Sequence, residues 1–342
     1  MTESDVAIVG AGPIGVELAA ALRRASVDYV QFEAGQIAQT IFEFAPQMRF
    51  FSSSRRIQLA AIPIQTTDQS KCTREEYLAY LRSLVQQLGL EVRTYERVTE
   101  IERIGAKYLL RTQTRSGQEH THRTSKLVLA TGGTSTPRTL GIPGEELPHV
   151  GHDLDDPHKY FRRRVLVVGG RNSAVEAALR CYHAGADVAI SYRNAQFHDR
   201  VKYWLKPEVE MLIETGRIDG FMGTIPVAIS SDAVTLQRVD SDETIEVPAD
   251  FVLLMIGYVA DMSLFQQVGV ELVEPANAPV HKEQTMETNV PGVYVAGTAV
   301  AGTQTTFQVF LENCHVHVDR IVAALIGAAP PPSPAPIAVP ET

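Results

Sequence analysis

Two segments of the chain share one order of apolar and polar positions. In the first, an apolar run over residues 6–9 leads into a glycine-rich turn at 10–15, an alanine-rich stretch at 16–24 and a second, mostly apolar run at 29–32. Short β-branched runs beside glycine predict buried strands, and the alanine-rich stretch predicts a helix between them. This order is typical of a βαβ unit with parallel strands.

The second segment repeats this order much later in the chain. An apolar run at 165–168 leads into a turn at 169–174, an alanine-rich stretch at 175–183 and a stretch at 187–190 that is apolar after its first residue, Asp187. The wide separation indicates two related domains and not a stack of short repeats. The length of 342 residues agrees, because one domain typically takes ~150 residues. We therefore expect an α/β chain with two Rossmann-like nucleotide-binding domains.

The remaining apolar positions predict further elements. Between residues 73 and 88 they fall at helical spacing, and Thr73 with Glu76 fits a capping box at the start of that helix. A last helix is expected from Phe310 to Ile326. Further strands are expected within residues 91–104, 108–114, 126–132, 234–238, 251–256 and 292–297.

Composition and charge exclude several classes of protein. The formal net charge is −9, whereas a general nucleic-acid binder needs a basic face. No apolar run approaches the ~20 residues of a membrane helix, and the N-terminal residues do not resemble a secretory signal. We expect a cytoplasmic protein without nucleic-acid or membrane partners. The Pro/Gly-containing residues 137–149 predict a crossing between domains, and the proline-rich residues 330–342 predict a disordered tail.

The first glycine-rich turn has the chemistry of a dinucleotide site. Gly10 permits a tight turn, Gly12 lets the backbone approach a pyrophosphate, and Gly15 lets the helix pack close to the strand. The helix N-terminus adds free N–H groups and a partial positive charge, worth roughly 0.3–2 kcal/mol per anion. Glu33 follows the second strand, where a carboxylate can accept hydrogen bonds from ribose hydroxyls. The first site is expected to hold FAD or NAD.

The second turn departs from this pattern at two positions. Arg171 replaces the middle glycine, and Tyr192, followed by Arg193, takes the place of Glu33. A carboxylate there would repel a 2′-phosphate, whereas an arginine attracts it and a tyrosine can stack on adenine. Arg200 and Lys202 can add positive charge. We expect NADPH at this site, with NADH as an alternative, and two dinucleotide sites in one chain suggest hydride transfer from a nicotinamide to a flavin.

Over residues 5–328 the chain resembles the thioredoxin-reductase-like flavoproteins, and among them the bacillithiol disulfide reductase family. The resemblance implies a discontinuous FAD-binding domain (1–140 and 259–328), an inserted NAD(P)H-binding domain (141–258) and a tail at 329–342. It also implies domains that reorient and a homodimer, as is common among relatives. The matching stretches are residues 10–15, 50–53, 95–98, 129–132, 169–178, 202–204, 294–297 and 310–313.

The turn chemistry and the resemblance together give two sets of expected cofactor residues. Many relatives carry aspartate where this chain has Thr298. The FAD set is Gly10, Gly12, Pro13, Ile14, Gly15, Glu33, Ala34, Val98, Ala130, Thr131, Gly132, Gly297 and Thr298. The NADP set is Gly169, Gly170, Arg171, Asn172, Ser173, Ala174, Tyr192, Arg193 and Gly257.

The chain departs from these relatives in its cysteines. Thioredoxin reductases carry a CxxC pair before the second glycine-rich turn. At that place this chain has His149 and His152, two histidines that can titrate near neutral pH. Relatives of the bacillithiol disulfide reductase type carry a cysteine in the first fingerprint, where this chain has Ile14. Thiol–disulfide exchange requires an attacking thiolate, so neither familiar route of disulfide reduction is expected.

The candidates for a catalytic group lie near the start of the last helix. Cys72, Cys181 and Cys314 are far apart, so neither a disulfide framework nor a zinc site is expected. Cys314 is interpreted either as a redox-active thiol near the flavin or as a packing residue. His315 and His317 are two residues apart and face different sides of a helix, so no shared metal site is expected. One of them can donate a proton or a hydrogen bond near the flavin. Tyr203 and Trp204 fit domain packing or a substrate platform.

Three hypotheses of function follow. The first is an FAD-dependent NAD(P)H oxidoreductase that passes electrons to an unidentified acceptor, either a small molecule or a redox protein. The second is a flavin-dependent monooxygenase or oxidase. The third is a non-catalytic flavin- or nucleotide-binding protein.

Overall fold

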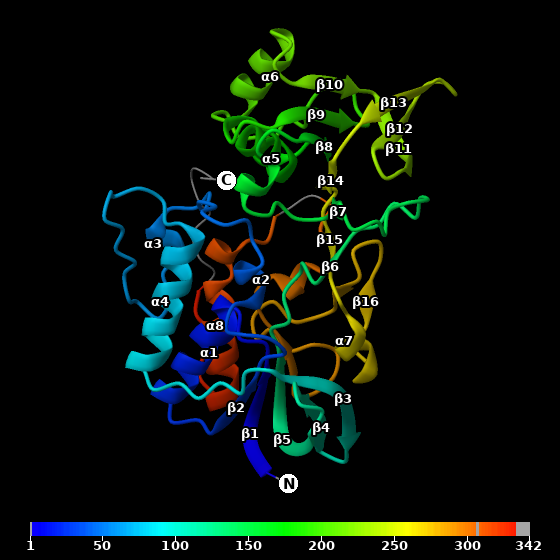
Figure 1. The fold of residues 1–342 in the computed structure, drawn as a ribbon. Coiled ribbons are helices and arrows are strands. Elements are labelled where there is room, and N and C mark those ends of the chain that lie inside the picture. Colours follow the sequence, from blue (N-terminus) through cyan, green and yellow to red (C-terminus); the bar gives the residue numbers. More distant parts are fainter. Residues whose placement is uncertain (1, 306–307, 333–342) are drawn as a thin grey trace. The chain divides into compact units, whose positions relative to one another are not determined.

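The structure is a computed structural model that describes residues 2–305 and 308–332. The chain divides into two compact units (Figure 1). Unit 1 comprises Met1–Glu43, Gln47–Thr136 and Tyr258–Thr342, and unit 2 comprises Phe44–Pro46 and Pro137–Gly257. Most of the predicted proline-rich tail, from residue 333 onward, lies outside the described residues.

Unit 1 is built on a sheet whose order is β2-β1-β5-β4-β3, with β18 also paired to β5. The strands β1, β2, β5 and β18 are parallel, whereas β3, β4 and β5 form an antiparallel meander. The strands of this sheet are β1 (Thr2–Val9), β2 (Tyr29–Phe32), β3 (Glu96–Ile104), β4 (Lys107–Thr114), β5 (Glu119–Leu129) and β18 (Val293–Val295).

The helices of unit 1 include the two that the sequence pattern predicts most clearly, α1 after the first turn and α4 with its capping box. Thr73 accepts a hydrogen bond from the Glu76 N–H, and the Glu76 carboxylate accepts one from the Thr73 N–H, so the predicted box is confirmed. The helices are α1 (Pro13–Arg24), α2 (Gln39–Phe42), α3 (Ser54–Ile57), α4 (Arg74–Gln87), α7 (Ser263–Gln267) and α8 (His315–Ile326).

The prediction of one continuous last helix from residue 310 is wrong. A short 3-10 turn covers Leu311–Asn313, and α8 begins only at His315. The Asn313 carboxamide accepts a hydrogen bond from the Phe310 N–H and donates one to the Gln308 carbonyl. Because these local bonds satisfy backbone groups that a longer helix would use, they end the helix before residue 315.

Short paired segments complete unit 1 and its boundary with unit 2. The chain passes between the units within β6 and just before β15. These segments are β6 (Thr136–Pro137), β15 (Tyr258–Val259), β16 (Leu272–Val273) and β17 (Ala278–Pro279).

Unit 2 has a parallel sheet of order β10-β9-β8-β14-β7 and a separate antiparallel sheet of order β11-β12-β13. Two helices, α5 (Asn172–His183) and α6 (Lys206–Glu214), accompany them. The strands are β7 (Val150–Gly151), β8 (Arg164–Val168), β9 (Asp187–Tyr192), β10 (Asp219–Met222), β11 (Thr224–Ile229), β12 (Ala233–Arg238), β13 (Thr244–Pro248) and β14 (Phe251–Leu254).

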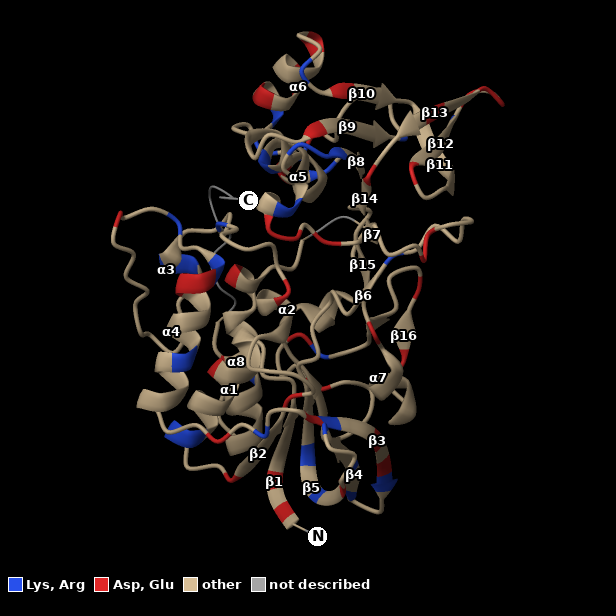
Figure 2. Ribbon diagram, viewed as in Figure 1, with Lys and Arg blue, Asp and Glu red and all other residues tan. Residues whose placement is uncertain are grey.

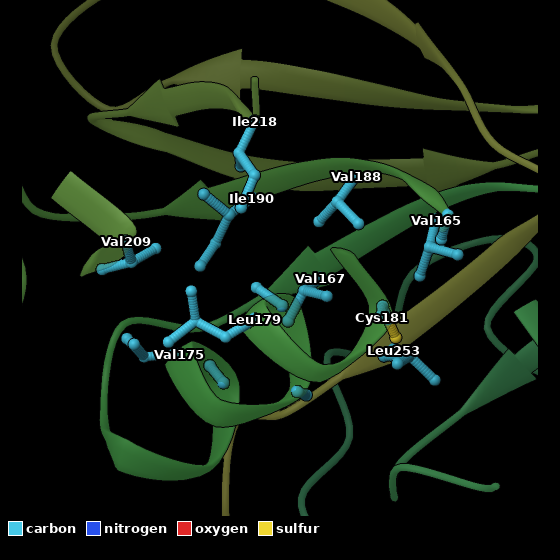
Figure 3. Packing of buried hydrophobic residues seen from close by; sticks show 14 of the residues in the cluster. Val165, Val167, Val175, Leu179, Cys181, Val188, Ile190, Val209, Ile218 and Leu253 are labelled. Carbon is cyan, nitrogen blue, oxygen red and sulfur yellow. The ribbon is translucent and has the colours of Figure 1, made fainter. Parts of the chain in front are cut away.

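The residues of β8 are almost all apolar because both faces of this strand are covered by other parts of unit 2. Val165 and Val167 pack into a core with α5 and α6, which Figure 3 shows from close by. Leu166 and Val168 face the opposite side and pack with residues of β11–β13. A parallel strand covered on both faces has no position left for a polar side chain. The predicted fold class, α/β with two Rossmann-like domains, is confirmed.

Candidate functional site

Three parallel strands of unit 1 end at the same level of the sheet. Leu129, the last residue of β5, is in register with Val9 at the end of β1 and with Val295 at the end of β18. The residues that follow, Gly10 and Ala130 among them, therefore meet at one edge. In open α/β sheets, ligands bind at this carboxyl edge.

The three glycines of the first turn meet three different surroundings. A Cβ on Gly10 would stand 2.4 Å from the Ala130 carbonyl oxygen, and its φ is +109°. A Cβ on Gly15 would stand 2.2 Å from the Gly10 carbonyl oxygen. A Cβ on Gly12 would meet nothing within 4 Å. Gly10 and Gly15 are thus required by the protein's own packing, whereas a Cβ on Gly12 would project into open space.

Glu33 supports the same turn with both carboxylate oxygens. Oε2 accepts a hydrogen bond of 2.7 Å from the Ala11 N–H, and Oε1 accepts one of 2.9 Å from the Gly35 N–H. Gln31, which is fully buried in β2, donates from Nε2 to the Gly10 carbonyl at 3.0 Å. The role of Gln31 is not predicted from the sequence, where its signal is a single polar residue within an otherwise apolar strand.

Further expected FAD residues gather beside this turn. A Cβ on Gly297 would stand 3.4 Å from the Ile14 Cβ, and one on Gly132 would stand 3.9 Å from the Thr298 hydroxyl. The Thr131 hydroxyl is buried and has no hydrogen-bond partner among the described residues. A buried polar atom of this kind needs a partner, so the surroundings fit a bound polar cofactor.

Three expected FAD residues lie at the margins of this group. Pro13 is the first residue of α1, directly after Gly12. Ala34 is exposed just beyond β2. Val98 is buried in β3, which begins beside the end of β2 because the Glu96 N–H donates to the Glu33 carbonyl at 3.0 Å.

Unit 2 repeats the construction of the first turn. Val168 at the end of β8 is in register with Leu254 at the end of β14. A Cβ on Gly169 would stand 2.6 Å from the Met255 carbonyl oxygen and 2.8 Å from the Ala174 Cβ. The carbonyl beyond β14 therefore limits Gly169 as the carbonyl beyond β5 limits Gly10.

The two cations expected at the second site, Arg171 and Arg193, are both exposed. Arg171 is the exposed N-cap of α5 and has an extended backbone with φ −112°, which any residue adopts without strain. Arg193 is exposed directly beyond β9, and Ser173 is exposed in the first turn of α5. Gly257 has a φ of +93°, which favours glycine. Lys and Arg residues also occur along the elements around α5 (Figure 2).

Tyr192 has a packing role that the sequence did not indicate. A Cβ on Gly170 would stand 2.3 Å from atoms of the Tyr192 ring, so the ring lies directly against this glycine. The ring of Tyr192 is also nearly parallel to that of Phe197, and the residue is only 8% exposed. Little ring surface is left for an adenine. Tyr203, for which domain packing and a substrate platform were both considered, is 83% exposed.

Cys314 has the properties of a packing residue. Its side chain is fully buried, and its Sγ–H donates to the Phe310 carbonyl at 3.0 Å. Burial raises the pKa of this thiol far above its usual range. Burial also raises the pKa of Cys72 to about 11 and that of Cys181 to about 12. A thiolate is therefore disfavoured at all three cysteines.

His315 joins three elements of unit 1. Nδ1 lies 2.7 Å from a carboxylate oxygen of Glu17 in α1, and Nε2 lies 2.8 Å from the Arg56 carbonyl in α3. Burial alone would lower the pKa of His315, but the hydrogen bond and charge of Glu17 outweigh it and raise the pKa. With an acceptor at each nitrogen, the imidazolium donates two hydrogen bonds. His315 thus links α8 to α1 and α3 through hydrogen bonds.

His317 lies on a different side of α8 and is buried. Burial, with the charges of His281 and Arg320, lowers the pKa of His317 to about 4. The side chain is neutral near pH 7 and its Nδ1 has no hydrogen-bond partner among the described residues. The expectation that His315 and His317 face different surroundings is confirmed.

The histidines at the place of the relatives' CxxC pair, His149 and His152, lie on either side of β7, and the buried Nδ1 of His152 has no hydrogen-bond partner among the described residues. Nε2 of His149 lies 3.0 Å from the Ser230 carbonyl.

Within residues 2–305 and 308–332, no group of three or more His, Cys, Asp or Glu residues is arranged to hold a metal ion. No helix in the described part of the chain is long and apolar enough to cross a bilayer.

Comparison with known proteins assigns the family. The sequence profile of the pyridine nucleotide-disulphide oxidoreductases matches residues 7–297. The chain belongs to this family. It is an NAD(P)H-dependent flavoprotein oxidoreductase of the thioredoxin-reductase-like type, with FAD and NADPH as the cofactors of the family.

The relatives of this family member extend over almost its whole length. It is 32% identical to the bacilliredoxin reductase Bdr of Bacillus subtilis, covering 95% of this chain and 98% of that protein. It is 28% identical to a ferredoxin–NADP reductase of Ignicoccus hospitalis, covering 86% and 89%. Among solved structures, the bacillithiol disulfide reductase Bdr of Bacillus cereus matches with a TM-score of 0.91 and 31% identity, covering 95% and 99%.

Proposed function

We propose that this chain takes hydride from NADPH to FAD and passes the electrons to an acceptor without a thiol of its own. The observation that carries the proposal is the repeated turn. Gly10 and Gly169 close in the same way on the carbonyl of a neighbouring strand end, but Glu33 follows β2 whereas Arg193 follows β9. Two turns with opposite charges suit two dinucleotides of which only one, NADPH, carries a 2′-phosphate.

The first turn suits the flavin dinucleotide. Open space at Gly12 and the first N–H groups of α1, which have no partner within the helix, together suit a pyrophosphate. The buried Thr131 hydroxyl supplies a polar atom that needs a partner. Bound there, FAD supplies the acceptor for hydride. The chain's own task is to hold and orient this group and to exclude water around it.

The second turn suits NADPH. The N–H groups at the start of α5 can hold the pyrophosphate, and Arg171 and Arg193 are exposed beside them. An arginine binds a phosphate through two charge-assisted hydrogen bonds. Arg193 follows the second strand of the βαβ unit, where the ribose of a dinucleotide lies, so it is the residue that we assign to the 2′-phosphate.

The acceptor must be one that needs no thiol on this chain. The three cysteines are buried with raised pKa values, and residue 14 in the first fingerprint is an isoleucine. The names of the relatives indicate two acceptors, a bacilliredoxin or bacillithiol disulfide and a ferredoxin. A ferredoxin accepts single electrons and needs no thiolate, so an acceptor of this kind fits the chain better. A homodimer and a cytoplasmic location remain predictions.

The test replaces the cysteines one at a time. In Cys72→Ala, Cys181→Ala and Cys314→Ala, NADPH-dependent reduction of a ferredoxin should proceed within about twofold of the wild-type rate, once rates are normalised to bound flavin. A variant that keeps its flavin and is reduced by NADPH, but no longer passes electrons on, would contradict the proposed thiol-free route.

A further inference from the structure

Asn172, the first residue of α5, uses its whole carboxamide on a neighbouring loop. Oδ1 accepts a hydrogen bond of 2.9 Å from the Lys202 N–H, and Nδ2 donates one of 3.2 Å to the Arg200 carbonyl. An amide side chain is a donor and an acceptor at once, and here each end meets its complement in the backbone. Both ends of the Asn172 side chain are therefore engaged with this loop.

The loop is fixed to the turn at further points. We call residues 198–204 the aromatic segment. The His198 N–H donates to the Gly170 carbonyl at 3.1 Å, and the Val201 N–H donates to the His198 carbonyl at 2.9 Å. Val201 is 5% exposed and belongs to the core that α5 and α6 share. The aromatic segment is thus bracketed against the fingerprint turn by hydrogen bonds and anchored beneath by apolar packing.

The aromatic segment carries side chains that suit a nucleotide. Arg200 is exposed, whereas Lys202 is only 9% exposed and its ammonium lies 5.9 Å from the centre of the Trp204 ring. The rings of Tyr203 and Trp204 meet edge to face with centres 4.8 Å apart. Cations bind phosphate, and aromatic rings offer flat surfaces to a base or a nicotinamide.

We propose that Asn172 is a positioning residue of the NADPH site, which acts by holding the aromatic segment as a wall beside the fingerprint turn. In this arrangement Arg200 is presented to the phosphates of the nucleotide, and its position depends on the bond from Asn172 to its carbonyl. The inference rests on the proposed function in one respect, namely that NADPH binds at residues 169–174.

The chain offers a matched control. Asn289 in unit 1 makes the same two kinds of bond, since its Oδ1 accepts from the Glu271 N–H at 2.9 Å and its Nδ2 donates to the Gly269 carbonyl at 3.1 Å. Asn289→Ala removes the same chemistry as Asn172→Ala, but far along the chain from the second turn. Trp204 is the single tryptophan of the chain, so its fluorescence reports on the aromatic segment alone.

The experiment measures flavin reduction by NADPH in a stopped-flow instrument, without oxygen or any other acceptor. In Asn172→Ala the half-saturating NADPH concentration should rise about tenfold, the factor that corresponds to 1.4 kcal/mol, while the limiting rate stays within about twofold. Acrylamide should quench Trp204 more strongly in this variant. Asn289→Ala should change neither the half-saturating NADPH concentration nor the quenching of Trp204, even if it lowers the melting temperature as much as Asn172→Ala does.

Three results would overturn the inference. One is an unchanged half-saturating concentration in Asn172→Ala. Another is a raised concentration with unaltered quenching of Trp204, because Asn172 would then act on the nucleotide directly. The third is an equal effect in Asn289→Ala. Should Asn172→Ala not fold, Asn172→Ser provides the same test with a small polar residue that suits the start of a helix. If wild-type flavin is not reduced by NADPH at all, the proposed function itself fails, which is a separate result.

Discussion

Gly10 lies against Ala130 so closely that a Cβ added to the glycine would stand 2.4 Å from the Ala130 carbonyl oxygen. The same distance between Gly169 and the Met255 carbonyl is 2.6 Å. In both units the first strand and a neighbouring parallel strand end together, and the glycine is the residue that lets the chain turn over the neighbour. Each of the two glycine-rich turns therefore begins, at the carboxyl edge of its sheet, with a glycine packed against a neighbouring carbonyl.

The first prediction separates two glycines of one turn. Gly10→Ala should destabilise the protein without any cofactor by about 2–4 kcal/mol, because the new methyl group overlaps a carbonyl and the backbone has a positive φ. Gly12→Ala should change that stability by less than about 0.5 kcal/mol, since its Cβ meets nothing within 4 Å. It should nevertheless lower the affinity for FAD. Denaturant unfolding of the apoprotein and flavin titration measure the two quantities, and a Gly12→Ala protein with unchanged flavin affinity would speak against the assignment of this turn.

The second prediction concerns the choice between NADPH and NADH. Arg193→Ala should weaken NADPH binding by about 1.5–3 kcal/mol, the usual effect of losing a charge-assisted hydrogen bond. Turnover with NADH, which lacks the 2′-phosphate, should change little. Steady-state kinetics with both nucleotides decide this, and equal losses with both would reject the assigned role of Arg193.

The third prediction is a loss of stability at higher pH. The folded pKa of His315 is raised by Glu17, so the stabilisation from this histidine is fully present below the usual pKa of about 6.5 and is lost as the pH rises through the raised value. His315→Gln should therefore be most destabilising at about pH 6 and should approach the wild type as the solution becomes alkaline. Urea unfolding across that range measures the difference, and a difference that grows with pH would be the wrong sign.

The fourth prediction concerns acid. The folded pKa of His317 is about 4, so its unfolded form binds a proton at a pH where the folded form does not. The stability present above about pH 6.5 should fall as the pH approaches 4, by at most about 3 kcal/mol for this residue. In His317→Gln this part of the acid sensitivity should be absent. An unfolding free energy that falls equally steeply with acid in both proteins would contradict the assignment.

The sequence predicted those features that depend on short stretches of chain. The periods of apolar residues placed β1, α1, β8 and α5, and Thr73 with Glu76 placed the start of α4. The turn glycines were recognised because glycines at this spacing, between a predicted strand and a predicted helix, are typical of a dinucleotide-binding turn. These are local properties, and neighbouring residues decide them.

The features that the sequence did not predict depend on residues far apart in the chain. Nothing near Tyr192 indicates that its ring lies on Gly170, and nothing near Asn172 indicates bonds to residues 200 and 202. The pairing of His315 with Glu17 joins positions almost 300 residues apart, since the sequence separation is 298. Such contacts are set by packing of whole elements, which no local pattern encodes.

The measurement that tests the central claim most directly is anaerobic mixing of the purified protein with NADPH while the visible absorption of the flavin is recorded. The account predicts a yellow protein whose flavin absorption is lost rapidly with one equivalent of NADPH per bound flavin. A colourless protein that does not take up added FAD, or a flavin that stays oxidised for minutes with NADPH in excess, would contradict it.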